Sequence, residues 1–219
     1  MIFLPISILI LFFLILLLPF FFFIVQIEII RIALSKIGLS PQMALLIFFL
    51  SLLGSLINIP VYTREAAIIP PQKIFPFFHF NPFGIPADPT KQIIAINLGG
   101  CIIPLLLCMY LIPRAPLLPT VFATVITVLV CFKISRVVPG TGIVVPALIP
   151  PLIAVALAFL FSPGNKIPVA YISGVLGVLI GADVLNLPHL GRYPGIMSIG
   201  GAGVYDGIFL VGIISALLA

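Results

Sequence analysis

The sequence predicts an all-α integral membrane protein with about seven transmembrane helices, some of them broken by Pro or Gly, and three observations support this fold class. The 219 residues are 63% hydrophobic and 7% charged, with a mean hydropathy of +1.42, whereas about a quarter of the residues in a typical globular domain are charged. Apolar runs of roughly 20 residues, enough to cross a bilayer core of about 30 Å, recur along the chain. The 22 prolines and 18 glycines indicate breaks, which survive in lipid where neighbouring helices or water satisfy the freed backbone groups.

The apolar runs divide a single polytopic domain, 1–219, into successive spans. The N-terminal run, MIFLPISILILFFLILLLPFFFFIV, has no basic residue before it and is too long for the apolar part of a signal peptide, so we expect it to be a retained first span. Ser40-Pro41 is typical of a helix start. The expected spans are 5–26, 41 to about 60, 92–112, 117–132, a fifth that ends near 161 after the broken stretch VVPGTGIVVPALIPP, 168–187 and 198–219.

The longest polar connection, 61–91, is expected to lie at the membrane interface. Its middle, IFPFFHFNPFGIP, is rich in Phe and Pro, and aromatic residues are enriched at headgroup level. One hypothesis is a loop held to the bilayer by its phenylalanines. The other is a lid or docking platform containing a strand that pairs with an extended substrate.

Two of the five acidic residues lie in the most apolar surroundings of the chain. Asp183 is near the end of the segment GVLIGADVLNL, and Asp206 lies in GGAGVYDGIFLVG. The short connection between these two segments makes them expected neighbours, and glycines on both allow close packing. Asp206 should lie about 10–12 Å deep in its helix at a rise of 1.5 Å per residue. Asn58, Asn97 and the PGTG break are expected on the same side, so we expect the two carboxyls to meet in one half of the bilayer.

Two carboxyls within hydrogen-bond distance in an apolar cavity favour one specific chemistry. Both cannot ionise at low energetic cost, so one keeps its proton. The ionised member can take a proton from a water while the neutral member protonates a carbonyl oxygen, which is aspartic-protease chemistry and uses no metal or cofactor. The expected residues are Asp183 and Asp206 as the catalytic pair, Gly181, Gly203 and Gly207 for close approach of a substrate backbone, and Tyr205 as a hydrogen-bonding group at the site's edge.

Three short motifs carry a resemblance to known families. YDGIFLVG at 205–212, IGAD at 180–183 and VPALIPP at 145–151 resemble the motifs of presenilin and signal peptide peptidase, the Gly-x-Gly-Asp intramembrane aspartyl proteases. Here the motifs occur in reverse order, and Ala182 occupies the place of a glycine. The resemblance implies that Pro146, Ala147 and Leu148 position the substrate. More broadly, the chain from SLINIP to SIGGAGVYDGIFL resembles a prokaryotic multi-pass family known as a domain of unknown function.

Other interpretations of the aspartates stay open. An ion- or proton-coupled transporter or channel would bind cations at broken helices with the same carboxylates, and a structural protein would use them for hydrogen bonds between helices. A metal site of Asp183, His189 and Asp206 is disfavoured, because no second histidine is near in sequence. Cys101, Cys108 and Cys131 lack metal-ligand spacing and suit plain packing.

The expected partners are transmembrane or signal-peptide-like substrates and the lipid bilayer, and a homo-oligomer is compatible with the sequence. The net charge of +5 is explained by basic loops and gives no reason to expect nucleic acid. The location is a cell membrane, with multiple passes. Six basic residues, against four on the opposite side, favour a cytoplasmic position for the aspartates by the positive-inside rule. The six are Arg64, Lys73, Lys91, Lys133, Arg136 and Arg192, and the four are Arg31, Lys36, Arg114 and Lys166.

Overall fold

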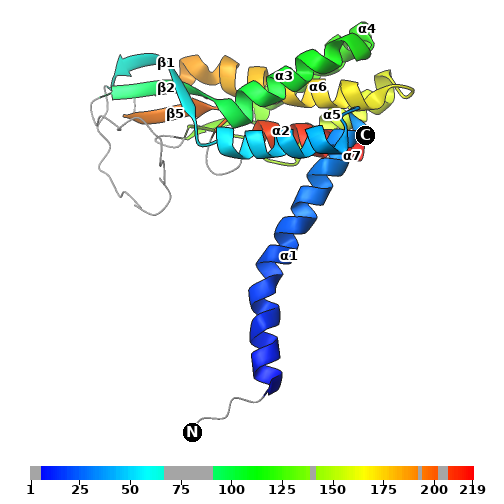
Figure 1. The fold of residues 1–219 in the computed structure, drawn as a ribbon. Coiled ribbons are helices and arrows are strands. Elements are labelled where there is room, and N and C mark those ends of the chain that lie inside the picture. Colours follow the sequence, from blue (N-terminus) through cyan, green and yellow to red (C-terminus); the bar gives the residue numbers. More distant parts are fainter. Residues whose placement is uncertain (1–5, 67–90, 139–141, 192–193, 202–206) are drawn as a thin grey trace.

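The fold is a body of packed helices with a small sheet at one end and one helix projecting from it (Figure 1). It is taken from a computed structural model that describes residues 6–66, 91–138, 142–191, 194–201 and 207–219. Its seven α-helices are α1 (Ile6–Lys36), α2 (Pro41–Gly54), α3 (Ile103–Leu111), α4 (Leu117–Ile134), α5 (Ile149–Phe161), α6 (Lys166–Val178) and α7 (Gly207–Leu218). Two π-helical turns are η2 (Leu98–Ile102) and η4 (Leu179–Asp183), and two 3₁₀ turns are η3 (Ile112–Arg114) and η5 (Val184–His189).

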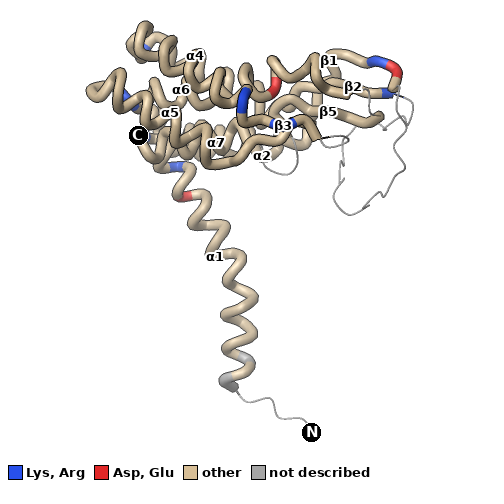
Figure 2. The backbone as a smooth tube through the Cα atoms, turned by 180° about the vertical axis from the view of Figure 1, so that it is seen from behind, with Lys and Arg blue, Asp and Glu red and all other residues tan. Residues whose placement is uncertain are grey.

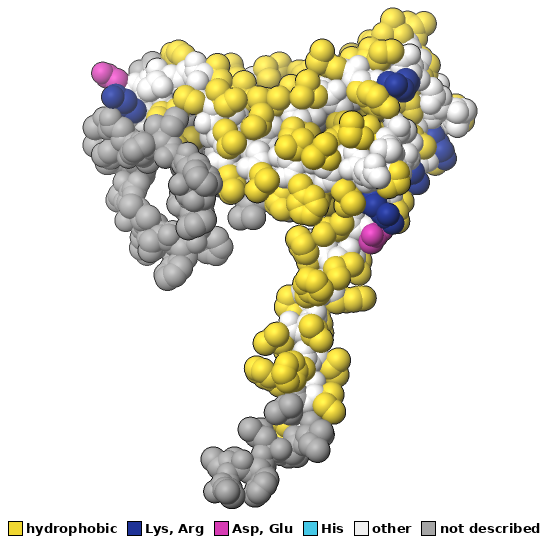
Figure 3. Space-filling view, in the orientation of Figure 1, with side chains coloured by type: hydrophobic (Ala, Val, Ile, Leu, Met, Phe, Trp, Pro, Cys, Tyr) yellow, Lys and Arg dark blue, Asp and Glu magenta, His cyan; other side chains and the backbone are white. Residues whose placement is uncertain are grey.

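Three helical segments, Ile10–Lys36, Leu117–Ile134 and Lys166–His189, are long and apolar enough to cross a membrane. Four shorter apolar segments, of 10–17 residues each, accompany them. Helix α1 leaves the body at a steep angle (Figure 1), and every side chain from 10 to 24 is exposed. Hydrophobic side chains cover this helix and much of the visible face of the body (Figure 3). An apolar surface of this extent is typical of contact with lipid rather than water.

The expectation of an all-α protein is wrong, because the described residues also form two small sheets. Strands β1 (Asn58–Glu65), β2 (Lys91–Asn97) and β5 (Gly195–Ile199) form a sheet in the order β1-β2-β5, antiparallel between β1 and β2 and parallel between β2 and β5. Strands β3 (Arg136–Val138) and β4 (Gly142–Val144) form a separate antiparallel pair. The predicted spans 92–112 and 198–219 therefore begin as strand or turn. Hydropathy alone cannot separate a buried strand from a helix, and the isoleucines of KQIIAIN favour the strand.

The ends of the 61–91 connection belong to this sheet, because Glu65 pairs with Lys91. Its middle, 67–90, lies outside the described residues, so neither hypothesis for the connection is tested. The helix start at Ser40-Pro41 is confirmed: the Ser40 hydroxyl accepts a hydrogen bond from the N–H of Met43 at 3.3 Å, with Pro41 as the first helical residue.

Helix α6 lies at the centre of the body and packs against α3, α4, α5 and α7. Small residues set the distances between these helices. A Cβ added at Gly174 would lie 2.7 Å from the Ser215 hydroxyl of α7, and one added at Gly212 of α7 would lie 2.8 Å from the Tyr171 ring of α6. The close packing of these two helices through glycine is therefore confirmed. In contrast, Gly177 faces Thr127 of α4.

The closest backbone approach joins α2 to the turn η2. A Cβ at Gly99 would lie 2.0 Å from the Ser51 carbonyl oxygen and 2.4 Å from the Ser55 nitrogen. The Ser51 hydroxyl donates to the Gly99 carbonyl at 2.9 Å. The contact therefore depends on the absence of a side chain at residue 99.

We predict that Gly99→Ala lowers the free energy of unfolding by about 1–3 kcal/mol or more, because a methyl group there must push two backbones apart. Thermal unfolding in detergent, followed with a dye that reacts with newly exposed thiols, measures the effect, since Cys101, Cys108 and Cys131 are buried and free. Gly164→Ala is the control, because nothing lies within 4 Å of a Cβ at Gly164. Equal stability of the two variants would contradict the packing described.

Candidate functional site

Asp183 lies at a break in the helix that continues α6. It is the last residue of the π turn η4, directly before the 3₁₀ turn η5, and its side chain is half-buried. The backbone N–H of Gly200 lies near its carboxyl. Asp183 is therefore in contact with the turn that follows β5. A π turn interrupts the regular hydrogen bonding of a helix, and such turns occur frequently at functional sites.

The break is held by the side-chain amide of Asn186. Its nitrogen donates to the carbonyl oxygens of Ala182 at 2.9 Å and Gly181 at 3.2 Å, and to the Ser135 hydroxyl at 2.8 Å. Asn186 is buried, so these bonds replace water as partners for carbonyls just before Asp183. Because Ser135 follows the last residue of α4, the same amide also ties the turn to the neighbouring helix. The backbone next to Asp183 is fixed from two sides.

A second buried amide, Asn97, organises the junction between the sheet and η2. Its nitrogen donates to the Ser55 carbonyl at 2.7 Å and to Asn58 Oδ1 at 3.1 Å, and its oxygen accepts from the Gly100 N–H at 2.8 Å. The Ser198 hydroxyl of β5 donates to the same Asn58 oxygen at 2.5 Å. Asn58 and Asn97 were expected on one side of the molecule, and they are in direct contact.

The chain that leads to Asp206 starts from this junction. Gly200 has a φ of +74°, and a Cβ there would lie 2.6 Å from the Cβ of Cys101. A Cβ at Gly201 would lie 2.6 Å from the Ser198 hydroxyl and 2.9 Å from the Asn97 Cβ. Both glycines are thus packed against neighbouring elements, and Gly200 also lies near the Asp183 carboxyl. This local geometry requires glycine at residue 200, because a positive φ is strained for other residues.

Three of the predicted site residues, Gly203, Tyr205 and Asp206, lie outside the described residues. Gly207 is the first residue of α7, and no described atom lies within 4 Å of a Cβ there. The expected depth of Asp206 falls outside the described residues. It assumed a helix from about residue 198, and that start is wrong, because Gly195–Ile199 is a strand. Asp206 therefore directly precedes the first residue of α7.

The remaining predicted site residues are Gly181, which is in the same turn as Asp183, and three residues that follow β4. Gly181 faces α4, where a Cβ would lie 2.3 Å from the Val128 carbonyl oxygen, so the close approach that it allows is between two helices. Pro146, Ala147 and Leu148 form an exposed turn between β4 and α5. Strand β4 contacts η4, which places this turn at the same end of the body as Asp183.

Charged and metal-binding groups are sparse near Asp183. Within the described ranges, no salt bridge includes this residue, and no three His, Cys, Asp or Glu side chains gather closely enough to hold a metal ion. His189 is exposed and lies beside the Phe132 ring, with 6.4 Å between ring centroids.

Sequence reasoning missed Asn186, Ser135 and Ser198. An available signal was the single asparagine in ADVLNL, three residues after Asp183, because an amide in an apolar segment needs partners of its own. The pairing of Arg64 with Gln92 across β1 and β2, which also brings Arg64 to the Leu190 carbonyl at 2.8 Å, was missed as well.

One known protein family matches the part of the chain that contains these residues. The family described as a protein of unknown function, DUF1614, matches residues 52–218, which include both aspartates and both asparagine networks but exclude α1. This match confirms the resemblance to a family of unknown function. No curated protein and no solved structure matches the chain.

We predict that Asn186→Ala lowers the free energy of unfolding by about 1–3 kcal/mol, because it leaves buried carbonyls at residues 181 and 182 without a donor. Thermal unfolding in detergent measures the loss. Ser135→Ala is the matched control, since it removes one partner of Asn186 but leaves both carbonyl bonds, and it should have the smaller effect. An unchanged midpoint for Asn186→Ala would show that the amide does not hold the turn.

Proposed function

We propose that this chain, which belongs to the DUF1614 family, is a multi-pass membrane hydrolase that cleaves membrane-embedded peptides with Asp183 and Asp206. The observation that carries the proposal is the closeness of the Gly200 N–H to the Asp183 carboxyl. It joins the first aspartate to the chain segment that contains the second. The proposed site lies at the sheet end of the body, facing the cytoplasm, and the number of spans is about seven.

The length of the connecting segment supports a meeting of the two carboxyls. Asp206 follows Gly200 by six residues, which reach at most about 20 Å when fully extended. On its other side, α7 starts at once, with Ile208 and Phe209 each 2% exposed in the same apolar core as Leu179 and Ala182 of η4. We infer that this short connection brings the Asp206 carboxyl to that of Asp183.

The chemistry requires a water between the carboxyls. The ionised carboxylate removes a proton from this water as its oxygen attacks the peptide carbonyl carbon, and the protonated carboxyl donates its proton to the carbonyl oxygen. The resulting tetrahedral intermediate is a gem-diol, and it collapses when the C–N bond breaks. The leaving nitrogen receives the proton taken from water, and the second carboxylate takes back a proton from a gem-diol hydroxyl as the product carboxyl forms. No covalent intermediate with the protein forms, and both aspartates return to their initial state.

A substrate has apolar surfaces to approach near Asp183. The turn of Pro146, Ala147 and Leu148 is exposed, with Leu148 62% accessible, and no described atom lies within 4 Å of a Cβ built on Gly207. A peptide segment with helical or extended backbone in the membrane fits such a surface better than a soluble peptide does. We therefore assign transmembrane or signal-peptide-like segments as the substrate class.

A second candidate, cation- or proton-coupled transport, is favoured by one observation. The π-helical turn η4, which ends at Asp183, interrupts the apolar helical segment Lys166–His189, and interrupted helices with a carboxylate at the break are a means of binding ions in transporters. The two functions differ in what they require of the aspartates. A hydrolase needs both carboxyls, whereas a cation site retains part of its affinity when one is removed.

We predict that Asp183→Asn and Asp206→Asn each reduce peptide cleavage by about 10²–10⁴-fold or more, because each removes a proton-transfer group. The assay uses protein reconstituted in liposomes with an apolar peptide of transmembrane length that carries a fluorophore and a quencher. Glu28→Gln is the matched control, since Glu28 is an acid on α1 paired with Arg31.

Two results would contradict the hydrolase. One is cleavage that persists in both single variants, and the other is a wild-type protein that leaves a panel of such peptides intact. In the second case, a proton or cation flux that Asp183→Asn weakens only in part would favour the transporter. Thermal unfolding of each variant shows that the loss of activity is separate from a loss of fold.

A further inference from the structure

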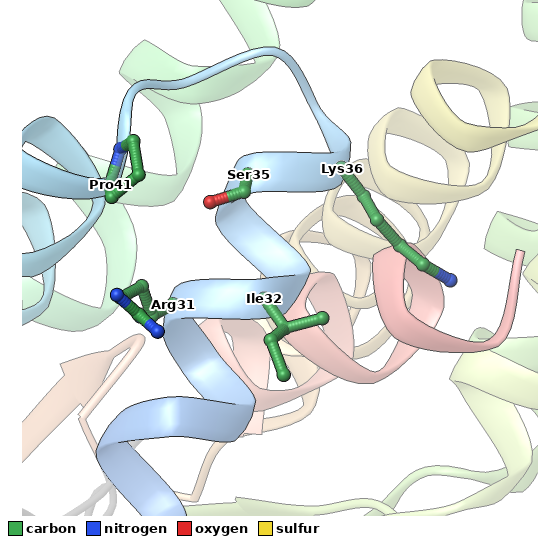
Figure 4. Close-up of a pocket in the computed structure, with 5 residues that line it drawn as sticks. All are labelled: Arg31, Ile32, Ser35, Lys36 and Pro41. Atoms are coloured by element: carbon green, nitrogen blue, oxygen red, sulfur yellow. The ribbon is translucent and has the colours of Figure 1, made fainter.

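An open cleft of about 450 Å³ lies where α1 meets α2, at the end of the body opposite the sheet. It is lined by Arg31, Ile32, Ser35, Lys36 and Pro41 (Figure 4). The guanidinium of Arg31 and the hydroxyl of Ser35 point to the same side of α1, toward the ring of Pro41 (Figure 4). Lys36 points toward α7, where its amine donates to the Leu217 carbonyl at 2.6 Å.

Basic residues gather at this end of the body, which we call the basic end and define by Arg31, Lys36, Arg114 and Lys166. Hydrogen bonds link its parts: Tyr110 donates to the Gly38 carbonyl at 3.3 Å, and Asn165 donates to the Arg114 carbonyl at 2.7 Å. Figure 2 shows such Lys and Arg positions near the end of α1 and at the adjoining helix ends. The acid that accompanies them among the described residues is Glu28, so the basic end carries a net positive charge.

The bases at the cleft keep donors for a ligand. The Glu28 carboxylate contacts one Nη atom of Arg31 at 2.5 Å, and a guanidinium has five N–H donors. The Ser35 hydroxyl adds a donor in the same direction (Figure 4). Planar donors of arginine match the oxygens of a phosphate group well.

The cleft continues directly into the most apolar surface of the protein. Side chains 10–24 of α1 are all exposed and uncharged, and the first charge follows at Glu28, one turn before Arg31. Ile32, at the cleft itself, is 49% exposed. A molecule that fits this surface carries a negative head beside Arg31 and long apolar chains along α1. Free phosphate would bind beside Arg31 alone, without contacts along α1.

We infer that the cleft binds the phosphate group of an anionic phospholipid, with its acyl chains along α1. The inference rests on the membrane location in the proposed function and is independent of the aspartate chemistry. It concerns a part of the chain outside the family match, which begins at residue 52. Bound lipid would fix α1 to the body at the point where Ile30, Ala33 and Leu34 are buried.

The test is the thermal unfolding midpoint of the full chain in a non-ionic detergent, with added phosphatidylglycerol, with phosphatidylcholine of the same acyl chains, or with inorganic phosphate. We expect phosphatidylglycerol to raise the midpoint more than the other two. Neutralising each base should weaken the apparent affinity for phosphatidylglycerol by about fivefold. Arg31→Gln/Lys36→Gln should therefore lose most of the difference between the two lipids.

The matched control is Lys133→Gln/Arg136→Gln, which removes two exposed charges next to β3 at the sheet end and should keep the lipid preference. For each variant, the readout is the difference between the midpoint shifts that the two lipids cause. A lower starting midpoint from loss of the Lys36–Leu217 hydrogen bond therefore does not affect it. Equal shifts with both lipids, an equal shift with inorganic phosphate, or a preference retained in Arg31→Gln/Lys36→Gln would each overturn the inference. None of these outcomes bears on peptide cleavage, which the aspartate variants test separately.

Discussion

The structure depends on one constraint: backbone groups released where apolar helices break must find hydrogen-bond partners inside the protein. Two buried asparagines supply these partners at the sheet end. Asn97 serves the transition from β2 into η2, and Asn186 serves the turn η4 beside Asp183. An unpartnered carbonyl in an apolar environment costs several kcal/mol. Because both amides are fixed in this way, the irregular backbone around Asp183 has a defined shape that a water or a substrate can meet.

This constraint separates the body into two ends with different chemistry. The sheet end holds the helix breaks, the asparagines and Asp183, and it contacts the segment before Asp206 through Gly200. The basic end holds positive charge that suits lipid headgroups. Between them, α6 and α7 pack through Gly174 and Gly212 without polar partners, and the buried Tyr171 and Ser215 hydroxyls have none in the described structure. In the described residues, the two π turns and both asparagine networks lie at the end where we place the reaction.

Much of the helical layout could be predicted from the sequence, because apolar runs, the Ser40-Pro41 start and the glycines of α6 and α7 act locally. The sheet could not be, since β2 and β5 pair between residues about a hundred positions apart, and a buried strand has the same hydropathy as a helix. The error concerned the start of the last span, which was expected at about residue 198, where β5 lies. The apolar segment that contains Asp183 could be predicted. The π turn at Asp183 and the Asn186 bonds that support it could not, because no local pattern indicated that turn.

The central claim is that the carboxyls of residues 183 and 206 lie side by side, and cross-linking tests it most directly. Cysteines replace both aspartates in a chain whose three native cysteines are alanine, and a short bifunctional thiol reagent is added to the protein in membranes. We expect mass spectrometry to find a peptide that joins residues 183 and 206, with a yield similar to that of Glu65→Cys/Lys91→Cys, a pair that is opposed in the sheet. Efficient cross-linking of the 65–91 pair without any 183–206 product would contradict the account.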